Sequence, residues 1–363
     1  MFIPESPVLK ITHLIKKNGS KSGIFNVFTR SAVFNSGRAA LSYGLKCLDI
    51  SRVWVPAYIC QSVLAPFNNL GIEVQFYDVD ERLRPVLDIL PREKDALLLV
   101  HFFGMCQEAR EIKQYCREKG IYLIEDCAHI IPDVYGDTIA GTYGDIAFFS
   151  FRKQLPVPDG GMLVINNPGI SFINQNSNIG HFPIKKMVIQ AAEKVAFITG
   201  INIYPYKDRL RGVVGSTNSV FMAGEDRVDN GISPVTTRIL SNIDIRRSIN
   251  NKRKSFLDLG QLLKGKGPIK PFGDITPGSV PQLYPVLIED NRDIICKSLR
   301  LHGIGASHWP GDEYVRGIDF NKFPGAKMWM EKNLLLPVNE SLGIKHLRDI
   351  SSRVVRLTYT GKE

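Results

Sequence analysis

Residues 121–161 read IYLIEDCAHIIPDVYGDTIAGTYGDIAFFSFRKQLPVPDGG and contain two short apolar runs that each end at charged residues. The first run ends at Glu125-Asp126 and the second at Arg152-Lys153. Short apolar runs bounded by turn residues are typical of buried strands. Because ligands of open α/β sheets bind outside the carboxyl ends of the strands, the stretch predicts a site where Asp126 and Lys153 meet one ligand.

The chain on both sides of this stretch alternates between predicted strands and predicted helices. We expect strands at 53–55, 74–77, 96–100 and 162–165, and helices at 39–48, 60–70 and 108–119. This alternation predicts a mostly parallel sheet covered by helices.

The second half of the chain has a different organisation. Residues 169–230 are expected to be a variable surface segment that closes over the site, and 233–263 to be one long helix. From residue 268 on, a strand at 282–288 and helices at 290–302 and 344–358 indicate an α+β layer.

The composition is that of an ordinary globular protein: 363 residues, 44% hydrophobic and 23% charged. The six cysteines form no CxxC pair, which argues against a zinc site or a redox motif and favours reduced thiols. No apolar run is long enough to span a bilayer, and the N-terminus lacks the pattern of a secretory signal. We therefore expect a cytoplasmic protein without a membrane partner.

The net charge of +10 allows three interpretations. A basic surplus can serve nucleic-acid binding, can lie on solvated helix faces, or can attract an anionic substrate. The basic clusters lack interleaved aromatic residues and match no nucleic-acid-binding module, so nucleic acid ranks last among these.

A second candidate ligand site is Ser36-Gly37-Arg38, which precedes the helix expected at 39–48. Backbone N–H groups at the start of a helix can bind an anion, with the helix dipole behind them. Taken alone, the stretch is explained as well by a plain capped helix. His101, at another strand end, is typical of a packed residue rather than a catalyst.

Several motifs in fixed order carry a resemblance to a known family. They are SGRAAL at 36–41, VPAY at 55–58, YDVD at 77–80, VHFFG at 100–104, IEDCAH at 124–129, GDIAFFSF at 144–151, KQL at 153–155 and DGG at 159–161. The chain resembles the fold-type I enzymes that depend on pyridoxal phosphate, and it is similar to the sugar aminotransferases of the DegT/DnrJ/EryC1/StrS family. The similarity runs through about residues 30–167.

The resemblance implies a three-layer αβα large domain over residues 1–240, with a mostly parallel sheet, and a smaller α+β domain over 241–363. It implies that Lys153 attaches to the cofactor and then moves protons as general acid and base, while Asp126 pairs with the pyridine nitrogen. His129 would lie beside the phenolic oxygen. The residues implied at the phosphate are Gly37, Arg38 and Ser150, and no metal is implied.

The sequence departs from the family pattern in three places. Only Arg152 separates Phe151 from Lys153, two residues fewer than usual, so the loop carrying the lysine is short. In the family, an aromatic ring usually stacks on the cofactor. The corresponding position of this chain falls near Cys60, and Tyr58 is a candidate to supply a ring instead. The family also takes a phosphate contact from a neighbouring subunit, which implies a homodimer with shared active sites and makes Asn230 the nearest candidate.

The function implied is amino transfer, from glutamate, to a keto-sugar linked to a nucleotide, in amino-sugar, surface-polysaccharide or secondary-metabolite biosynthesis. Two other functions stay open. Sugar dehydratases of the family replace the lysine with histidine, so Lys153 favours transamination. A non-catalytic or regulatory protein could also retain the fold.

Overall fold

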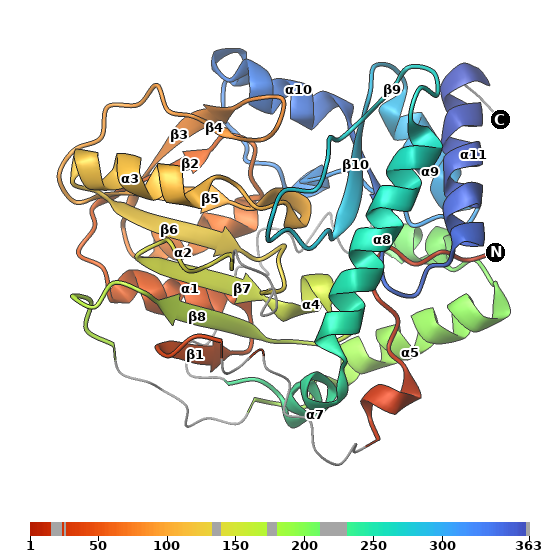
Figure 1. Cartoon of the computed structure of the whole chain (residues 1–363), viewed down its shortest axis with the longest axis horizontal. Coiled ribbons are helices and arrows are strands. Elements are labelled where there is room, and N and C mark those ends of the chain that lie inside the picture. Colours follow the sequence, from red (N-terminus) through yellow and green to blue (C-terminus); the bar gives the residue numbers. More distant parts are fainter. Residues whose placement is uncertain (16–23, 25–26, 133–138, 173–179, 211–230, 361–363) are drawn as a thin grey trace.

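The computed structural model describes residues 1–15, 24, 27–132, 139–172, 180–210 and 231–360, and it contains two β-sheets (Figure 1). The larger sheet has eight strands in the order β1-β8-β7-β6-β5-β2-β3-β4. These strands are β1 Ser31–Phe34, β2 Arg52–Pro56, β3 Glu73–Val79, β4 Pro85–Val86, β5 Asp95–Val100, β6 Tyr122–Cys127, β7 Ile146–Ser150 and β8 Gly161–Ile165. The central strands β3, β2, β5, β6 and β7 run parallel, whereas β1, β4 and β8 pair antiparallel with their neighbours. The mostly parallel sheet predicted from the sequence is therefore confirmed.

Both faces of the sheet are covered because its central strands are apolar at successive positions. Every residue of β5, β7 and β8 is buried, as expected for strands that lie between two helical layers. Helix α1 (Gly37–Lys46) packs on one face of β7 and β8, where Gly44 lies against Ile146 and Leu163. The opposite face, with Ala147 and Phe149, shares a core with the later helices α7 and α8.

Two elements place the charged residues of the opening stretch. Strand β6 continues through Cys127, so Glu125 and Asp126 lie inside the strand near its end rather than in a following loop, and Asp126 pairs with Phe148 of β7. Helix α4 (Phe151–Gln154) begins directly after β7 and carries Lys153. Helix α3 (Ala109–Lys119) precedes β6 and ends at Gly120, whose φ of 66° requires the left-handed conformation that glycine adopts readily.

Two of the predicted helices are divided in the structure. The single helix predicted over 233–263 is wrong: α7 (Pro234–Asn242) and α8 (Ile245–Leu263) are separate, because the Asp244 side chain accepts the Arg247 N–H at 3.0 Å and starts a new helix. The helix predicted over 60–70 is a 3₁₀ turn, η3 (Gln61–Val63), followed by α2 (Ala65–Asn69).

The smaller sheet is antiparallel, with strands β9 (Ile269–Pro271), β10 (Leu283–Ile288) and β11 (Asn333–Pro337) in the order β11-β10-β9. Its helices are α9 (Arg292–Leu301), α10 (Pro324–Lys332) and α11 (Ile344–Thr360). The sequence predicts β10, α9 and α11 but not β9, β11 or α10. The N-terminal Ile3 packs into the core of this layer and pairs with Ile304.

Helix α5 (Ile184–Thr199) lies within the segment 169–230 that is expected to close over the site. Its inner side packs through Ala196 against Phe2 and Tyr204, and Phe197 meets the ring of His346 in α11. The described part of this segment therefore lies against the N-terminal residues and the C-terminal helices. No helix in the described ranges combines the length and apolar character needed to cross a bilayer.

Candidate active site

Lys153 reaches the end of β6 despite its short connection to β7. Its Nζ lies 3.0 Å from Nε2 of His129. The short helix α4 provides this reach, and Gln154 fixes it, because the Gln154 amide donates to the backbone oxygens of His129 at 2.6 Å and Val280 at 2.7 Å.

The hydrogen bonds of His129 define the charge state of the lysine. The backbone N–H of Phe103 donates to His129 Nδ1 at 3.2 Å, so this nitrogen is an acceptor. A neutral imidazole then carries its hydrogen on Nε2 and donates it to the Lys153 amine. An uncharged amine has the lone pair to accept this hydrogen, so the geometry favours the neutral form of Lys153.

The surroundings of Lys153 and His129 also favour the uncharged forms of these two side chains. Burial lowers the pKa of Lys153 below its ordinary value, although the nearby Asp126 carboxylate opposes this shift. Burial and the neighbouring Lys153 charge lower the pKa of His129 well below the ordinary value. A buried lysine with a lowered pKa is the form that can act as a nucleophile at neutral pH.

Asp126 lies at the buried end of β6 and is 5% exposed. Its Oδ1 accepts the Ala128 N–H at 2.8 Å. Burial raises the pKa of this carboxyl group, and the charge of Lys153 and the Ala128 N–H only partly offset the increase. A bound cation would therefore be strongly favoured beside Asp126, because it would relieve the cost of burying the carboxylate.

A third part of the site is the start of α1, next to the end of β7. A Cβ atom on Gly37 would lie 3.1 Å from Cβ of Ser150, so these two predicted phosphate residues are in contact range. Gly161 permits this approach, since a Cβ there would lie 2.3 Å from the Ser36 carbonyl group. The Ser36 hydroxyl caps α1 by accepting the Ala39 N–H at 3.2 Å. Arg38, the third residue implied at the phosphate, is half-buried in the first turn.

The two candidates for stacking on the cofactor have other partners. Tyr58 is fully buried, and its hydroxyl donates to the Trp309 carbonyl oxygen at 2.9 Å. The Cys60 thiol donates to Glu313 Oε2 at 2.7 Å, and burial together with Glu313 raises its pKa to about 11. Cys60 is close enough to Lys153 to influence its pKa, whereas Tyr58 has no surface to offer a ligand. Asn230, the predicted contact from a second subunit, lies outside the described residues.

The fold brings further residues to this place, of which sequence reasoning names only Trp309, as a candidate substrate contact or a packing residue. Trp309 contacts His129 edge-to-face, with 5.7 Å between ring centroids. Phe103 stacks on the other side of that imidazole at 6.0 Å. Trp309 and Glu313 are far along the chain, and no local spacing links them to Lys153. The VHFFG motif at 100–104 was the signal that could have indicated Phe103.

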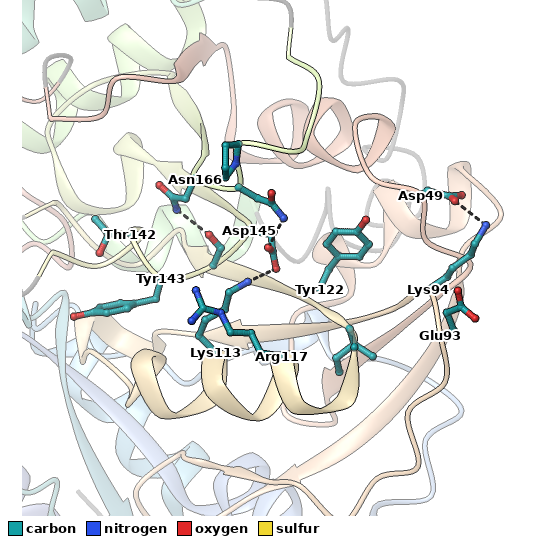
Figure 2. Close-up of a pocket in the computed structure, with 15 residues that line it drawn as sticks. Asp49, Glu93, Lys94, Lys113, Arg117, Tyr122, Thr142, Tyr143, Asp145 and Asn166 are labelled. Atoms are coloured by element: carbon teal, nitrogen blue, oxygen red, sulfur yellow. Dashed lines mark hydrogen bonds and ion pairs between the residues drawn. The ribbon is translucent and has the colours of Figure 1, made fainter.

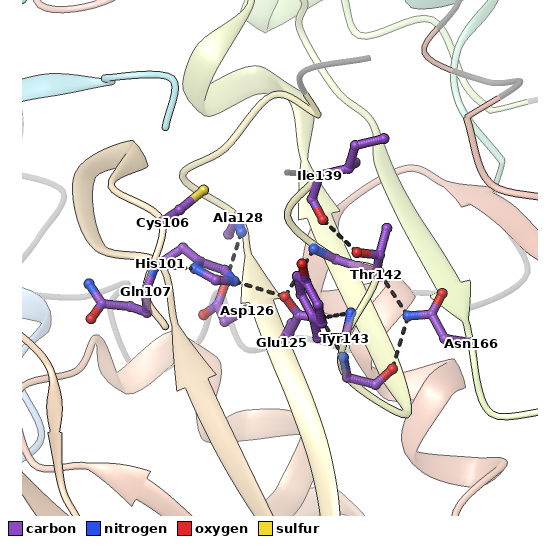
Figure 3. A network of polar contacts seen from close by, with 12 residues as sticks. His101, Cys106, Gln107, Glu125, Asp126, Ala128, Ile139, Thr142, Tyr143 and Asn166 are labelled. Carbon is purple, nitrogen blue, oxygen red and sulfur yellow. Dashed lines mark hydrogen bonds and ion pairs between the residues drawn. The ribbon is translucent and has the colours of Figure 1, made fainter. Parts of the chain in front are cut away.

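Glu125, next to Asp126, has a structural role (Figure 3). Its carboxylate accepts His101 Nε2–H at 3.0 Å, the Gly141 N–H at 3.0 Å, the Tyr143 N–H at 2.8 Å and the Gly144 N–H. Burial alone would raise the pKa of Glu125, but these donors hold it below the ordinary value. His101, Glu125 and Cys127 are also close enough to suggest a metal site. The carboxylate and both His101 nitrogens already have partners, since His101 Nδ1 accepts the Gln107 N–H, so this group is explained without a metal.

A cavity of about 660 Å³ lies at the opposite end of the sheet, around Tyr122 at the amino end of β6 (Figure 2). Four of the charged residues that line it form two ion pairs. Lys113 lies 2.6 Å from Asp145, and Lys94 lies 2.7 Å from Asp49. The cavity is separate from Lys153, and the sheet rule places ligands at the other end.

Comparisons with known proteins agree with this geometry. Residues 28–181 match the model of the DegT/DnrJ/EryC1/StrS aminotransferase family. The chain is 37% identical, over 38% of its length and 38% of the relative, to a dTDP-4-dehydro-2,3,6-trideoxy-D-glucose 4-aminotransferase of Saccharopolyspora spinosa. It is 31% identical, over 37% of its length and 39% of the relative, to GDP-perosamine synthase of Vibrio cholerae. The matches thus span about two fifths of each of these relatives.

The fold extends further than the sequence similarity. The structure of Helicobacter pylori PseC, an aminotransferase involved in pseudoaminic acid biosynthesis, superposes with a TM-score of 0.69 at 16% identity, over 99% of both chains. The chain therefore shares the α/β fold of this solved aminotransferase. In sequence, residues 28–181 of the chain are similar to the DegT/DnrJ/EryC1/StrS aminotransferase family.

Proposed function

We propose that this protein is a pyridoxal-phosphate-dependent aminotransferase that transfers an amino group from glutamate to a keto-sugar linked to a nucleotide. The observation that carries the proposal is the Lys153 amine, which lies 3.0 Å from His129 Nε2, has a lowered pKa and is close to the buried carboxyl group of Asp126. The names of the relatives, which aminate or make amino forms of dTDP- and GDP-linked sugars, support the substrate class.

The residues present fit the cofactor. A buried carboxylate suits a protonated pyridine nitrogen, a neutral lysine suits an aldehyde, and the start of α1 beside Ser150 suits a phosphate. When bound, pyridoxal phosphate supplies an aldehyde that takes up amines and a ring that draws electrons from the carbon beside the nitrogen.

The protein's own residues would then perform three tasks. Asp126 holds the ring nitrogen protonated by placing a negative charge against it. Lys153 would hold the cofactor through its amine and would also move a proton at the reacting carbon atoms as general base and acid. His129, fixed by the Phe103 N–H and by Gln154, holds the Lys153 amine in position and keeps it uncharged.

Four further parts of the proposal concern the whole protein. We propose a cofactor-binding domain at 1–240, a small domain at 241–363 and a homodimer with active sites at the subunit interface. The exposed face of α5, with Ile184, Val188, Val195 and Ile198 each more than half exposed, supports self-association. The six free thiols support a reducing, cytoplasmic environment.

The first test asks whether Lys153 carries the cofactor. Pyridoxal phosphate is added to the purified protein, borohydride is used to fix it, and the modified peptide is identified by mass spectrometry. We expect the label on Lys153 and its loss in Lys153→Arg, while Lys113→Arg, which changes a half-buried lysine outside the site, retains it. Labelling of many surface lysines, with no preference for Lys153, would contradict the proposal that the protein is a pyridoxal-phosphate-dependent enzyme.

The second test concerns the substrate. The protein is first converted to its amine form with glutamate, and the visible absorbance is then followed as dTDP- and GDP-linked keto-sugars are added separately. Recovery of the original spectrum with formation of an amino sugar is expected for one of them. Release of water from the sugar without amino-group transfer would instead support the dehydratase alternative.

A further inference from the structure

Trp309 is placed at the site from the far end of the chain. Its ring lies 5.7 Å from His129 and 5.9 Å from Phe103, edge-to-face with both. Phe103 is 1% exposed and has no free face, whereas Trp309 remains half-buried. Of these two rings, Trp309 is therefore the one with surface left for a ligand that lies beside His129 and Lys153.

The backbone of Trp309 is held by a buried polar clamp. The Asn333 side chain accepts the Trp309 N–H and donates to the Trp309 carbonyl oxygen, each at 2.9 Å, and Asn333 is fully buried. The Tyr58 hydroxyl donates to the same carbonyl oxygen at 2.9 Å. Three hydrogen bonds from buried side chains fix this residue more firmly than a half-exposed packing residue requires.

The clamp also explains what Tyr58 does. Its ring lies 4.8 Å from Trp309 and is enclosed by Phe102 at 5.5 Å and Trp329 at 6.1 Å. Tyr58 therefore lies behind Trp309 rather than at the ligand. Cys60, which stands at the other candidate position, is a thiol bonded to Glu313 and offers no ring.

We propose that Trp309 forms the aromatic wall of the cofactor pocket, and that Tyr58 and Asn333 are positioning residues for it. The proposal rests on the proposed function, since it requires pyridoxal phosphate at Lys153. A flat indole ring binds a planar heteroaromatic ring through dispersion and offset stacking, and such pairs contribute beyond simple burial of area. The wall would then come from the C-terminal part of the chain, while the lysine and carboxylate come from the large sheet.

The experiment measures the dissociation constant of pyridoxal phosphate by absorbance for the wild type, Trp309→Phe and Trp309→Leu. We expect roughly ten-fold weaker binding for Trp309→Leu and a smaller loss for Trp309→Phe, because aromatic pairs are worth about 1 kcal/mol. The circular dichroism of the bound cofactor should also change in Trp309→Leu, since it reports the groups around the ring. Trp54→Leu is the matched control, because Trp54 bonds Asp95 at the opposite end of the sheet.

A second variant separates contact from folding. Tyr58→Phe keeps the buried ring but removes the hydroxyl that holds Trp309, so we expect weaker cofactor binding and an altered dichroism band with little change in the unfolding midpoint. If the wild type does not bind the cofactor at Lys153, the proposed function fails. If the wild type binds it and Trp309→Leu binds it equally well with an unchanged dichroism band, only the assignment of Trp309 fails.

Discussion

The two ends of the large sheet both hold a lysine near an aspartate, but in different chemical states. At the amino end, Lys113 and Asp145 form a 2.6 Å ion pair, and Asp145 also accepts the Leu123 N–H at 2.7 Å and the Asn167 amide at 2.8 Å. At the carboxyl end, Lys153 bonds to a neutral histidine, and Asp126 accepts one backbone N–H.

This difference shows how burial alone produces reactivity. A carboxylate with a full set of donors is stable and chemically inert, as Asp145 and Glu125 are. A carboxylate and an amine that are desolvated without such partners have shifted pKa values, which is what cofactor chemistry requires. We therefore expect substitutions at the amino end to cost stability and substitutions at the carboxyl end to cost function.

The largest effect is expected for Asp145→Ala. This change leaves the Lys113 ammonium group, the Leu123 N–H and the Asn167 amide without their acceptor. Removing one partner of a buried ion pair costs about 3–5 kcal/mol, measured as the free energy of unfolding in denaturant. Asp145→Asn retains an acceptor for Leu123 and should lose less. Equal stability of Asp145→Ala and wild type would contradict the contrast between the two ends.

The second prediction is that Lys153→Met stabilises the cofactor-free protein at neutral pH, by roughly 0.5–2 kcal/mol, as is common for substitutions at functional sites. The folded-state pKa of Lys153 is lowered from 10.5, so the unfolded chain binds more protons between that lowered pKa and 10.5. Wild-type stability therefore rises with pH in this window. Unfolding curves at several pH values should show the advantage of Lys153→Met shrinking toward pH 10.5. An advantage that does not depend on pH would show that the lysine's charge is not its source.

The smallest effect is expected for Lys94→Ala, at the rim of the same cavity as Lys113. Lys94 pairs with Asp49 at 2.7 Å, but both side chains are exposed, so the pair is screened by water. The unfolding midpoint should not change measurably, and Lys113→Met provides the half-buried comparison. A loss for Lys94→Ala as large as that for Asp145→Ala would mean that burial does not decide the strength of these pairs.

The sequence predicted the central sheet well because its strands are buried and continuous. The short apolar runs of β5 and β7 are typical of buried strands, and Gly120 marks the end of α3. The division between α7 and α8 was missed because it depends on one side chain, Asp244, that could equally lie on a helix surface. Short elements such as β9 and β11 have too few residues to show a period.

The site was predictable where its residues are close in sequence and hidden where they are not. Asp126, His129, Ser150 and Lys153 lie at the ends of two adjacent strands, so the strand prediction alone brings them together. Trp309 and Asn333 come from the smaller layer, and only the tertiary fold places the Trp309 ring beside His129, with Asn333 bonded to the Trp309 backbone. No sequence pattern indicates that Trp309 lies close to His129.

The pairing of β1 with β8 has a consequence for how the protein is made. Ser31 pairs with Val164, and Phe34 pairs with Gly161, which brings the start of α1 to the loop that follows Lys153. During synthesis on the ribosome, β1 emerges long before β8 and must wait for its partner while the intervening strands are translated. Contacts of such large sequence separation form late and slowly. The part of the site that we propose to bind the phosphate is therefore translated first and completed last, so cofactor uptake would report the end of folding of this sheet.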